Sequence, residues 1–307
     1  RSDIRHFLPG ARSVIVAGAV YNTQGPSGVV SQSSGGSDGG SGTKPSDAVQ
    51  VARYARGQDY HIVLAERLER LTTWMREQTQ EPFETAIFVD KHHVQERVYA
   101  QHAGIGWIGK NSCVINPELG SYMFLCGVAT SLTLDVDAPA TDQCGACTLC
   151  LDSCPTGAIV DEHVIDATRC ISYLTIEVDG AIPEPQRAWL GNHAYGCDIC
   201  QEVCPYNLAP VVTADPAWTA APRDGASAAE LWQRTDAELH DFVKGSAMTH
   251  LPLSGLRRNL AIVIGNAGDA ALAPALDRPG HGVKNSAHSA HTPVVEEAVA
   301  WARRRLK

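Results

Sequence analysis

The residues of this chain most able to do chemistry are its cysteines. Ten cysteines occur in 307 residues, and eight of them fall between Cys144 and Cys204. Thiolates select iron–sulfur clusters or zinc, and short Cys-x2-Cys loops let successive sulfur atoms face one metal centre. The first run has the spacing Cys-x2-Cys-x2-Cys-x3-Cys-Pro and consists of Cys144, Cys147, Cys150, Cys154 and Pro155. In bacterial ferredoxins three thiolates of such a run bind one [4Fe–4S] cluster and the fourth binds another.

A second run, Cys-x2-Cys-x3-Cys-Pro, follows downstream and lacks a first cysteine. Ala194 stands in that place, and Cys170 is the expected substitute. We therefore expect one cluster on Cys144, Cys147, Cys150 and Cys204, and a second cluster on Cys154, Cys170, Cys197 and Cys200. Zinc is the alternative, since paired Cys-x2-Cys loops also make structural zinc sites. Zinc does not require the third cysteine, the x3 spacing and the proline twice, so the sequence favours two [4Fe–4S] clusters.

The two remaining cysteines, Cys113 and Cys126, lie in apolar sequence and are expected in the core. A disulfide framework would spread its cysteines through a small chain, whereas these are clustered within a large acidic one. We therefore expect a reducing compartment, the cytoplasm. Two adjacent clusters form a path for electrons, and such a path implies an acceptor at its end.

Composition excludes several classes of protein. Hydrophobic residues make up 44% of the chain and charged residues 19%, with a net charge of −9. These values exclude a disordered tail, a coiled coil and a histone-like polycation. No apolar run reaches the roughly 18 residues of a membrane helix, so we expect no membrane contact. The first residue is Arg1, and we expect a segment to be missing before it.

Charge divides the chain into three blocks. Residues 1–136 carry 12 basic and 13 acidic side chains, residues 137–210 carry 2 and 11, and residues 211–307 carry 11 and 10. Nearly all of the excess acid thus accompanies the cysteines. We expect one domain for each block.

The hydrophobic pattern predicts an α+β protein. In the first block, buried strands are expected at residues 12–21, 85–90 and 122–131, and helices at 61–78 and 94–103. Residues 25–44 are rich in Gly and Ser and predict a surface loop. In the last block, residues 256–265 and 295–304 superpose at a spacing of 39. That spacing is close to the period of about 40 to 47 of HEAT-type helical pairs, so we expect a HEAT-like helical domain packed on the preceding one.

Two further motifs are candidates for cofactor sites. Gly104, Gly106 and Gly109 match G-x-G-x-x-G, but the dinucleotide fingerprint follows a strand and opens a helix, whereas a helical segment precedes these glycines. We interpret the glycines as allowing close backbone approach to a large flat group. His92 and His93 follow Asp90, but adjacent residues do not face the same way on a helix, which disfavours a mononuclear metal site.

Several segments resemble the epoxyqueuosine reductase family. They comprise YARGQDYH (54–61), Asp90 with QER (95–97), AGIGWIGKN (103–111), the first cysteine run, RCISYLTIE (169–177) and LGNHAYGCDICQEVCP (190–205). Their order matches the family from Arg1 to about Pro205, and residues 258–269 resemble its helical C-terminal repeat. The match covers nearly the whole chain.

The resemblance implies an oxidoreductase that reduces the epoxide of epoxyqueuosine, at the wobble position of tRNA, to queuosine. It implies an α/β cobalamin-binding and catalytic domain (1–136), a bacterial-type ferredoxin-like domain with two [4Fe–4S] clusters (137–210) and the HEAT-like domain (211–307). Electrons would pass through the clusters to cobalamin. Because the chain has no Asp-x-His-x-x-Gly signature, we expect base-off cobalamin without a histidine ligand from the protein.

The resemblance also implies site residues. Asp90 is the expected catalytic acid, and an apolar pocket would raise the pKa of its carboxyl. The expected cobalamin contacts are Arg56, Tyr60, Asp90, Gly106, Lys110, Asn111, Ser112, Ser172 and Asp198. Family members commonly follow the aspartate with a small residue, then Ala or Gly, then Pro. Lys91, His92 and His93 stand here instead, which changes the wall of the substrate pocket.

The implied partners are a tRNA anticodon stem-loop and a low-potential electron donor of flavodoxin or ferredoxin type, acting on a monomer. Phosphate contacts need local basic residues, whatever the net charge. The candidates are Arg257, Arg258, Lys284, Arg303, Arg304, Arg305 and Lys307. Residues 303–305 have an alternative role, since cations at a helix end also complement the helix dipole.

Two other functions share parts of this pattern. A reductive dehalogenase-like enzyme has cobalamin and two clusters, but it usually carries a twin-arginine signal and lacks a helical repeat after the clusters. A two-cluster electron carrier would have no reaction of its own. Cobalamin binding separates the carrier from both enzymes, and conversion of epoxyqueuosine separates the two enzymes.

Overall fold

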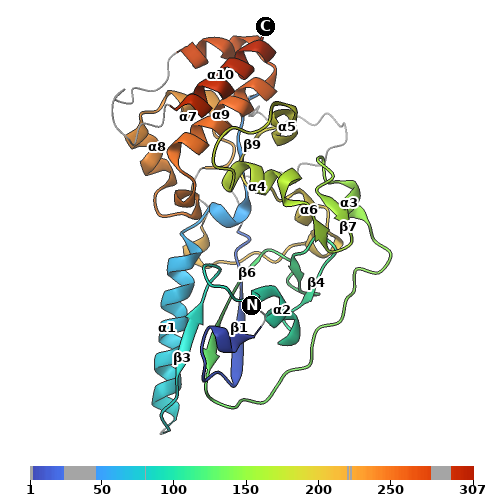
Figure 1. Cartoon of the computed structure of the whole chain (residues 1–307), viewed down its shortest axis with the longest axis vertical. Coiled ribbons are helices and arrows are strands. Elements are labelled where there is room, and N and C mark those ends of the chain that lie inside the picture. The colour runs from blue at the N-terminus through green and yellow to red at the C-terminus, as the bar shows by residue number, and fades with distance from the viewer. Residues whose placement is uncertain (1–2, 24–45, 80, 220, 222, 278–291) are drawn as a thin grey trace. The chain divides into compact units, whose positions relative to one another are not determined.

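The computed structural model describes residues 3–23, 46–79, 81–219, 221, 223–277 and 292–307 (Figure 1). The expected loop at 25–44 lies outside these residues. The chain forms two compact units. Unit 1 consists of Arg1–Asn22, Gly57–Asp166 and Asp198–Trp218, and unit 2 of Thr23–Arg56, Ala167–Cys197 and Thr219–Lys307. Within the described part of the chain, no helix has the length and apolar character needed to cross a bilayer.

A three-stranded antiparallel sheet forms the centre of unit 1. Its strand order is β1 (Ser13–Val20), β6 (Met123–Thr130) and β3 (Thr85–Phe88). The three strands expected from their apolar runs are confirmed. The central strand, β6, is the most deeply buried, as expected for a strand with neighbours on both sides. The carboxyl end of β3 leads directly to Asp90.

Helix α1 (Tyr60–Gln78) packs against β3 and β6. Asp59 caps its first turn by accepting a hydrogen bond from the His61 N–H. The buried face consists of Tyr60, Leu64, Leu68, Thr72 and Met75. The 3.6-residue period therefore located this helix correctly. Helix α2 (Glu96–His102) is shorter than the predicted segment, because it begins two residues later.

The glycine-rich segment after α2 forms a small hairpin. Strand β4 (Trp107–Ile108) pairs with β5 (Val114–Ile115). A Cβ at Gly106 would lie 2.3 Å from the carbonyl oxygen of Ile115. The close approach that this glycine permits is therefore to β5. We expected this glycine to let the backbone approach a large flat group, and that interpretation was wrong, because the neighbouring group is the backbone of β5.

Each cysteine run contains a short helix. Helix α3 (Leu149–Asp152) lies in the first run, α6 (Ile199–Glu202) lies in the second, and the two helices contact each other. A two-stranded ribbon, β7 (Ile159–Asp161) with β8 (Val164–Ile165), extends from the first run.

Unit 2 is mainly helical. It contains a parallel pair, β2 (Gln50–Val51) with β9 (His193–Tyr195). Its helices are α4 (Ile171–Ile176), α5 (Glu184–Arg187), α7 (Ala228–Gln233), α8 (Asp236–Val243), α9 (Leu253–Ala267) and α10 (Pro293–Arg305). Helices α9 and α10 contain the two superposable segments and pack together (Figure 1). A HEAT-like repeat and the three-domain division stay predictions.

Two arginines that were candidates for RNA contact are buried inside unit 2. Arg257 and Arg258 are each 1% exposed. Arg257 pairs with Asp236 at 2.8 Å, and Arg258 donates to the carbonyl oxygens of Leu174, Val178 and Gly180. Burial lowers the pKa of Arg258 to about 10. Their expected role at an RNA surface was therefore wrong, because both guanidinium groups are used to join elements of unit 2.

Of the remaining RNA candidates, Lys284 lies outside the described residues. Arg303 pairs with Asp277 at 2.8 Å and Arg304 with Glu184 at 3.0 Å. Arg305 lies over the Trp301 ring. These contacts favour the alternative of a structural role at the end of α10.

Candidate functional site

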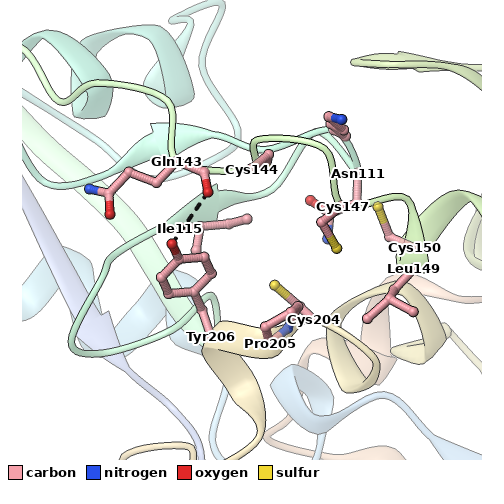
Figure 2. A pocket seen from close by; sticks show the side chains of 11 residues that line it. Asn111, Ile115, Gln143, Cys144, Cys147, Leu149, Cys150, Cys204, Pro205 and Tyr206 are labelled. Atoms are coloured by element: carbon pink, nitrogen blue, oxygen red, sulfur yellow. Dashed lines mark hydrogen bonds between the residues drawn. The ribbon is translucent and has the colours of Figure 1, made fainter.

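Four cysteine side chains of unit 1 surround one cavity of about 200 Å³ (Figure 2). They are Cys144, Cys147, Cys150 and Cys204. Cys144 and Cys147 lie in the loop before α3 and Cys150 lies in α3 itself. Cys204 comes from the end of the second run, 54 positions further along the chain than Cys150. This is the set that the spacing predicted for the first cluster. The sequence grouped these four cysteines only by analogy with bacterial ferredoxins. The structure places their four sulfur atoms around one cavity.

Local hydrogen bonds fix the loop that carries these sulfur atoms. The Cys144 N–H donates to Asp142 at 2.8 Å, and the Cys147 N–H donates to the Cys144 carbonyl at 3.1 Å. Pro205 opens a 3-10 turn (Pro205–Asn207) directly after Cys204, which suits a residue without an N–H. The position of Pro205 after Cys204 is therefore explained by the local structure.

The walls of this cavity supply hydrogen-bond donors. The Trp107 indole N–H donates to the Cys144 sulfur at 3.3 Å, and Trp107 is 1% exposed. The Lys110 ammonium donates to the Gly145 carbonyl at 2.8 Å and pairs with Glu162 at 2.7 Å. In Figure 2, the Tyr206 hydroxyl reaches the Gln143 carbonyl on the side opposite Cys150. These hydrogen bonds hold the walls of the cavity together.

The size of the cavity distinguishes a cluster from zinc. Zinc bonds to thiolate at about 2.3 Å, so a four-cysteine zinc site closes around a single ion. Here the four sulfur atoms border a space of about 200 Å³. The arrangement therefore fits an iron–sulfur cluster.

The second predicted ligand set is divided between the two units. Cys154 and Cys200 belong to unit 1, whereas Cys170 and Cys197 belong to unit 2. The Cys154 sulfur accepts the Ala158 N–H at 3.3 Å. The grouping of these four residues stays a prediction from their spacing.

The two cysteines that were expected in the core, Cys113 and Cys126, differ in burial. Cys126 is 3% exposed in β6, as predicted. Cys113 is only half-buried, and its thiol forms a hydrogen bond with Cys200. The prediction was wrong for Cys113, because the turn after β4 brings it beside the second cysteine run.

A second group of polar side chains lies at the end of β3. Asp90 has a φ of 54°, in the left-handed region that Asp and Asn tolerate better than most residues. The Tyr60 hydroxyl donates to the Asp90 carboxylate at 2.5 Å, and His61 Nε2 lies 3.5 Å from the same oxygen. The Asp90 side chain is 62% exposed. Protein atoms therefore do not provide the apolar pocket that was expected around this carboxyl.

His61 connects Asp90 to a second carboxylate. Its Nδ1 atom lies 2.7 Å from Asp59. Burial acts to lower the pKa of His61, but hydrogen bonds with Asp90 and Asp59 outweigh burial and raise that pKa above 6.5. Burial and the Asp90 charge raise the pKa of Tyr60, so its hydroxyl keeps its proton. Asp90 thus lies next to a protonated tyrosine hydroxyl and an imidazole whose raised pKa favours its charged form.

Comparison with known proteins shows the family to which the chain belongs. Residues 143–207 match the family model "4Fe-4S double cluster binding domain", and residues 1–91 match "Epoxyqueuosine reductase QueG, DUF1730". The chain is 38% identical to the epoxyqueuosine reductase of Gloeobacter violaceus over 285 residues, which cover 88% of this chain and 81% of that protein. The chain belongs to the epoxyqueuosine reductase family.

Further relatives agree with this assignment. The epoxyqueuosine reductase of Xanthomonas campestris is 41% identical over 254 residues, covering 82% of this chain and 69% of that protein. A solved epoxyqueuosine reductase with an epoxyqueuosine-modified tRNA-Tyr stem loop matches 98% of this chain and 75% of its own, at 28% identity and a TM-score of 0.84. The family resemblance and an iron–sulfur domain are confirmed. The dehalogenase-like and carrier alternatives are not favoured.

A third comparison concerns the aspartate. The epoxyqueuosine reductase structure from Bacillus subtilis has an aspartate-containing catalytic loop that is swung out of the active site. It matches 98% of this chain and 75% of its own, at 28% identity and a TM-score of 0.84.

Within this family member, the predicted cobalamin contacts fall in both units. Arg56 and Ser172 belong to unit 2, where Arg56 pairs with Asp224 at 3.2 Å. The other predicted contacts belong to unit 1: Tyr60, Asp90, Gly106, Lys110, Asn111, Ser112 and Asp198. Asn111 donates to the Cys200 carbonyl and Ser112 to the His163 carbonyl. Lys110 and Asn111 also line the four-cysteine cavity.

Glu96 is a functional neighbour that sequence reasoning did not assign. Its carboxylate accepts the Asp90 N–H at 2.6 Å, which fixes the turn after β3. Burial raises the pKa of Glu96 to about 7; the Asp90 N–H opposes this shift and the Asp90 charge adds to it. The available signal was an acid at the first position of a helix six residues after Asp90.

We expect Glu96→Gln to change how stability depends on pH. A carboxyl whose pKa rises from 4.5 to about 7 on folding favours the folded state below pH 4.5, and this contribution is lost as pH rises through 7. The variant has no such ionisation, so its melting temperature relative to the native chain should increase between pH 5 and pH 8. Differential scanning fluorimetry measures this difference. Glu77→Gln, at an exposed position on α1, is the control, and a difference for Glu96→Gln that does not vary with pH would contradict the expectation.

Proposed function

We propose that this chain reduces the epoxide of epoxyqueuosine in a tRNA anticodon stem-loop to queuosine. The observation that carries the proposal is the match of 98% of the chain to an epoxyqueuosine reductase holding such a stem-loop. The Asp90 turn and the four-cysteine cavity support it, because both lie in unit 1 and provide an acid and an electron path.

Deoxygenation of an epoxide needs two electrons and two protons, and the oxygen leaves as water. Asp90 is the proposed acid for the epoxide oxygen. Its side chain is exposed and adjoins two hydrogen-bonding partners, which suits a group that meets a substrate from solvent. The description of a catalytic aspartate loop in the Bacillus subtilis enzyme supports this role.

We propose that His61 resupplies the proton. It lies 3.5 Å from Asp90, its raised pKa favours the imidazolium near neutral pH, and Asp59 holds the opposite ring nitrogen at 2.7 Å. Tyr60 holds the Asp90 carboxylate in place through its hydroxyl. Asp59 and Tyr60 are therefore positioning residues in this proposal.

The two [4Fe–4S] clusters are proposed on the ligand sets predicted from spacing. The first set has a site in unit 1 that fits, because its four sulfur atoms surround one cavity. A cluster there supplies one-electron transfer. A flavodoxin- or ferredoxin-type donor and a monomeric enzyme in the cytoplasm complete the proposal.

Cobalamin is proposed as the group that provides a strongly reduced cobalt. Asp90 and Tyr60 fit a place beside it, since Asp90 is exposed and Tyr60 orients its carboxylate. Lys110, Asn111 and Ser112 fit less well, because each side chain already bonds to a carbonyl oxygen of the chain. Lys110 and Asn111 are also only 4% and 3% exposed, so little of either side chain is available for contact with cobalamin.

The test uses the full chain with both clusters reconstituted. Titration with cobalamin should produce a base-off absorption spectrum, and nucleoside mass spectrometry should show queuosine formed from an epoxyqueuosine stem-loop under reducing conditions. Absence of the spectral change would overturn the cobalamin assignment. A spectral change without queuosine would overturn the substrate.

We expect Trp107→Phe to lower the reduction potential of one cluster. The indole N–H points at the Cys144 sulfur, and donors to cluster sulfurs favour the reduced, more negative state. If that preference is roughly 1 kcal/mol, the potential should fall by about 40 mV for one electron, since about 59 mV is tenfold in the equilibrium constant. EPR-monitored redox titration measures it. Tyr206→Phe, which leaves this hydrogen bond intact, is the control, and equal potentials in both variants would contradict the expectation.

A further inference from the structure

A second cavity of unit 1 adjoins Asp90. It has a volume of about 500 Å³ and is lined by His6, Phe7, Lys91, His92 and His93, hereafter the His-Lys cavity. The last three residues directly follow Asp90, so the cavity begins one residue beyond the proposed acid. These are also the residues at which the chain departs from the usual family pattern after the aspartate.

Local contacts hold the two segments of the His-Lys cavity together. The Phe7 ring meets the His92 ring edge-on, with centroids 5.0 Å apart, and meets Phe88 of β3 at 6.2 Å. The 3-10 turn before Phe7 (Ile4–His6) is capped by Asp3. The Asp3 carboxylate pairs with Arg5 at 2.6 Å, so this nearby acid is already neutralised.

The lining has the chemistry of a nucleotide site. None of its five residues is acidic, one carries an ammonium group and three carry imidazoles that donate hydrogen bonds. Phosphate accepts from such donors, while the Phe7 and His92 rings present faces and edges to a base. A volume of about 500 Å³ falls in the range of roughly 300 to 1,000 Å³ typical of small-molecule sites. A single nucleotide is of this size and charge.

We propose that the His-Lys cavity binds a nucleotide of the anticodon loop next to the epoxyqueuosine nucleotide, with its phosphate on Lys91 and His93. The inference rests on the proposed function, because it needs an RNA substrate whose reacting nucleotide reaches Asp90. It assigns RNA contact to unit 1, whereas the basic residues predicted for RNA lie in the last block of the chain.

The test is fluorescence anisotropy of the reconstituted full chain with a fluorescein-labelled tRNA-Tyr anticodon stem-loop, between 50 and 200 mM salt. Lys91→Ala should weaken binding several-fold and reduce the slope of log affinity against log salt by about one. Lys91→Ala with His93→Ala should weaken it further. Arg70→Ala is the matched control, since it removes one exposed cation from α1 of the same unit.

Each result decides the inference separately from the proposed function. Equal salt slopes for Lys91→Ala and Arg70→Ala would overturn it. Unchanged RNA affinity with weakened binding of reduced flavodoxin would also overturn it, and would assign the cavity to an acidic protein surface. Conversion of epoxyqueuosine by the native chain tests the function itself, so the native chain can remain active while this inference fails. Iron content of each variant checks that the fold is intact.

Discussion

Asp90→Asn is expected to lower the rate of queuosine formation by roughly 10² to 10⁴, the usual contribution of a positioned general acid. The substitution removes the transferable proton and keeps the shape of the side chain. An amide oxygen still accepts the Tyr60 hydroxyl, and the Asp90 N–H still reaches Glu96. Asn also tolerates the φ of 54° at this position, so no backbone strain is added. Single-turnover rates with an epoxyqueuosine stem-loop measure the effect.

A matched control separates loss of the acid from loss of the fold. Asp137→Asn changes an exposed carboxylate of unit 1 in the same way and should leave the rate within about twofold of the native value. Iron content and the cobalamin spectrum should be unchanged in both variants. An Asp90→Asn rate equal to that of Asp137→Asn would remove Asp90 from the acid role.

The parts of the fold that sequence predicted well are those governed by local periodicity. Apolar runs located β1, β3 and β6, and the spacing of Leu64, Leu68 and Met75 located α1. Such patterns report which face of an element is buried, whatever the rest of the chain does. The cysteine run was equally informative, because its ligand spacing is itself local.

The parts that could not be predicted depend on contacts between distant segments. Arg258 looked like a surface cation in sequence, yet carbonyl oxygens of residues 174–180 surround it. Cys113 looked like a core residue, yet its thiol contacts Cys200, 87 positions away. Composition carries no record of such partners. The burial of a residue therefore cannot be predicted from its neighbours in sequence when distant segments form its environment.

The same limit applies to the electrostatics of the site. The pKa of the Asp90 carboxyl was expected to rise through burial, but that carboxylate is exposed. The nearby acid whose pKa is raised by partial burial is Glu96. The helix-start position of Glu96 was visible in the sequence. The hydrogen bond that Glu96 accepts from the Asp90 N–H could not be predicted, because it depends on the conformation of the turn between them.

Cys204→Ala is expected to lower the iron content from about eight toward about four per chain, because it removes one of four thiolates of a single [4Fe–4S] cluster. The matched control is Cys126→Ala. Both side chains are buried, at 7% and 3% exposed, so both variants lose a similar packed sulfur atom. Cys126 lies in β6, outside the four-cysteine cavity, and its variant should keep full iron. Equal iron loss in both variants would contradict a ligand role for Cys204.

The double variant Cys144→Ala with Cys204→Ala tests which cysteines share a cluster. Both sulfur atoms line the same cavity, although 60 positions separate them in the chain. Because removing two ligands of one cluster destroys only that cluster, the double variant should retain about four iron atoms, as each single variant does. Cys154→Ala with Cys204→Ala should lose nearly all iron, since these two belong to different predicted sets. Loss of all iron in the first double variant would mean that Cys204 serves the second cluster, and that the cavity brings together ligands of two clusters.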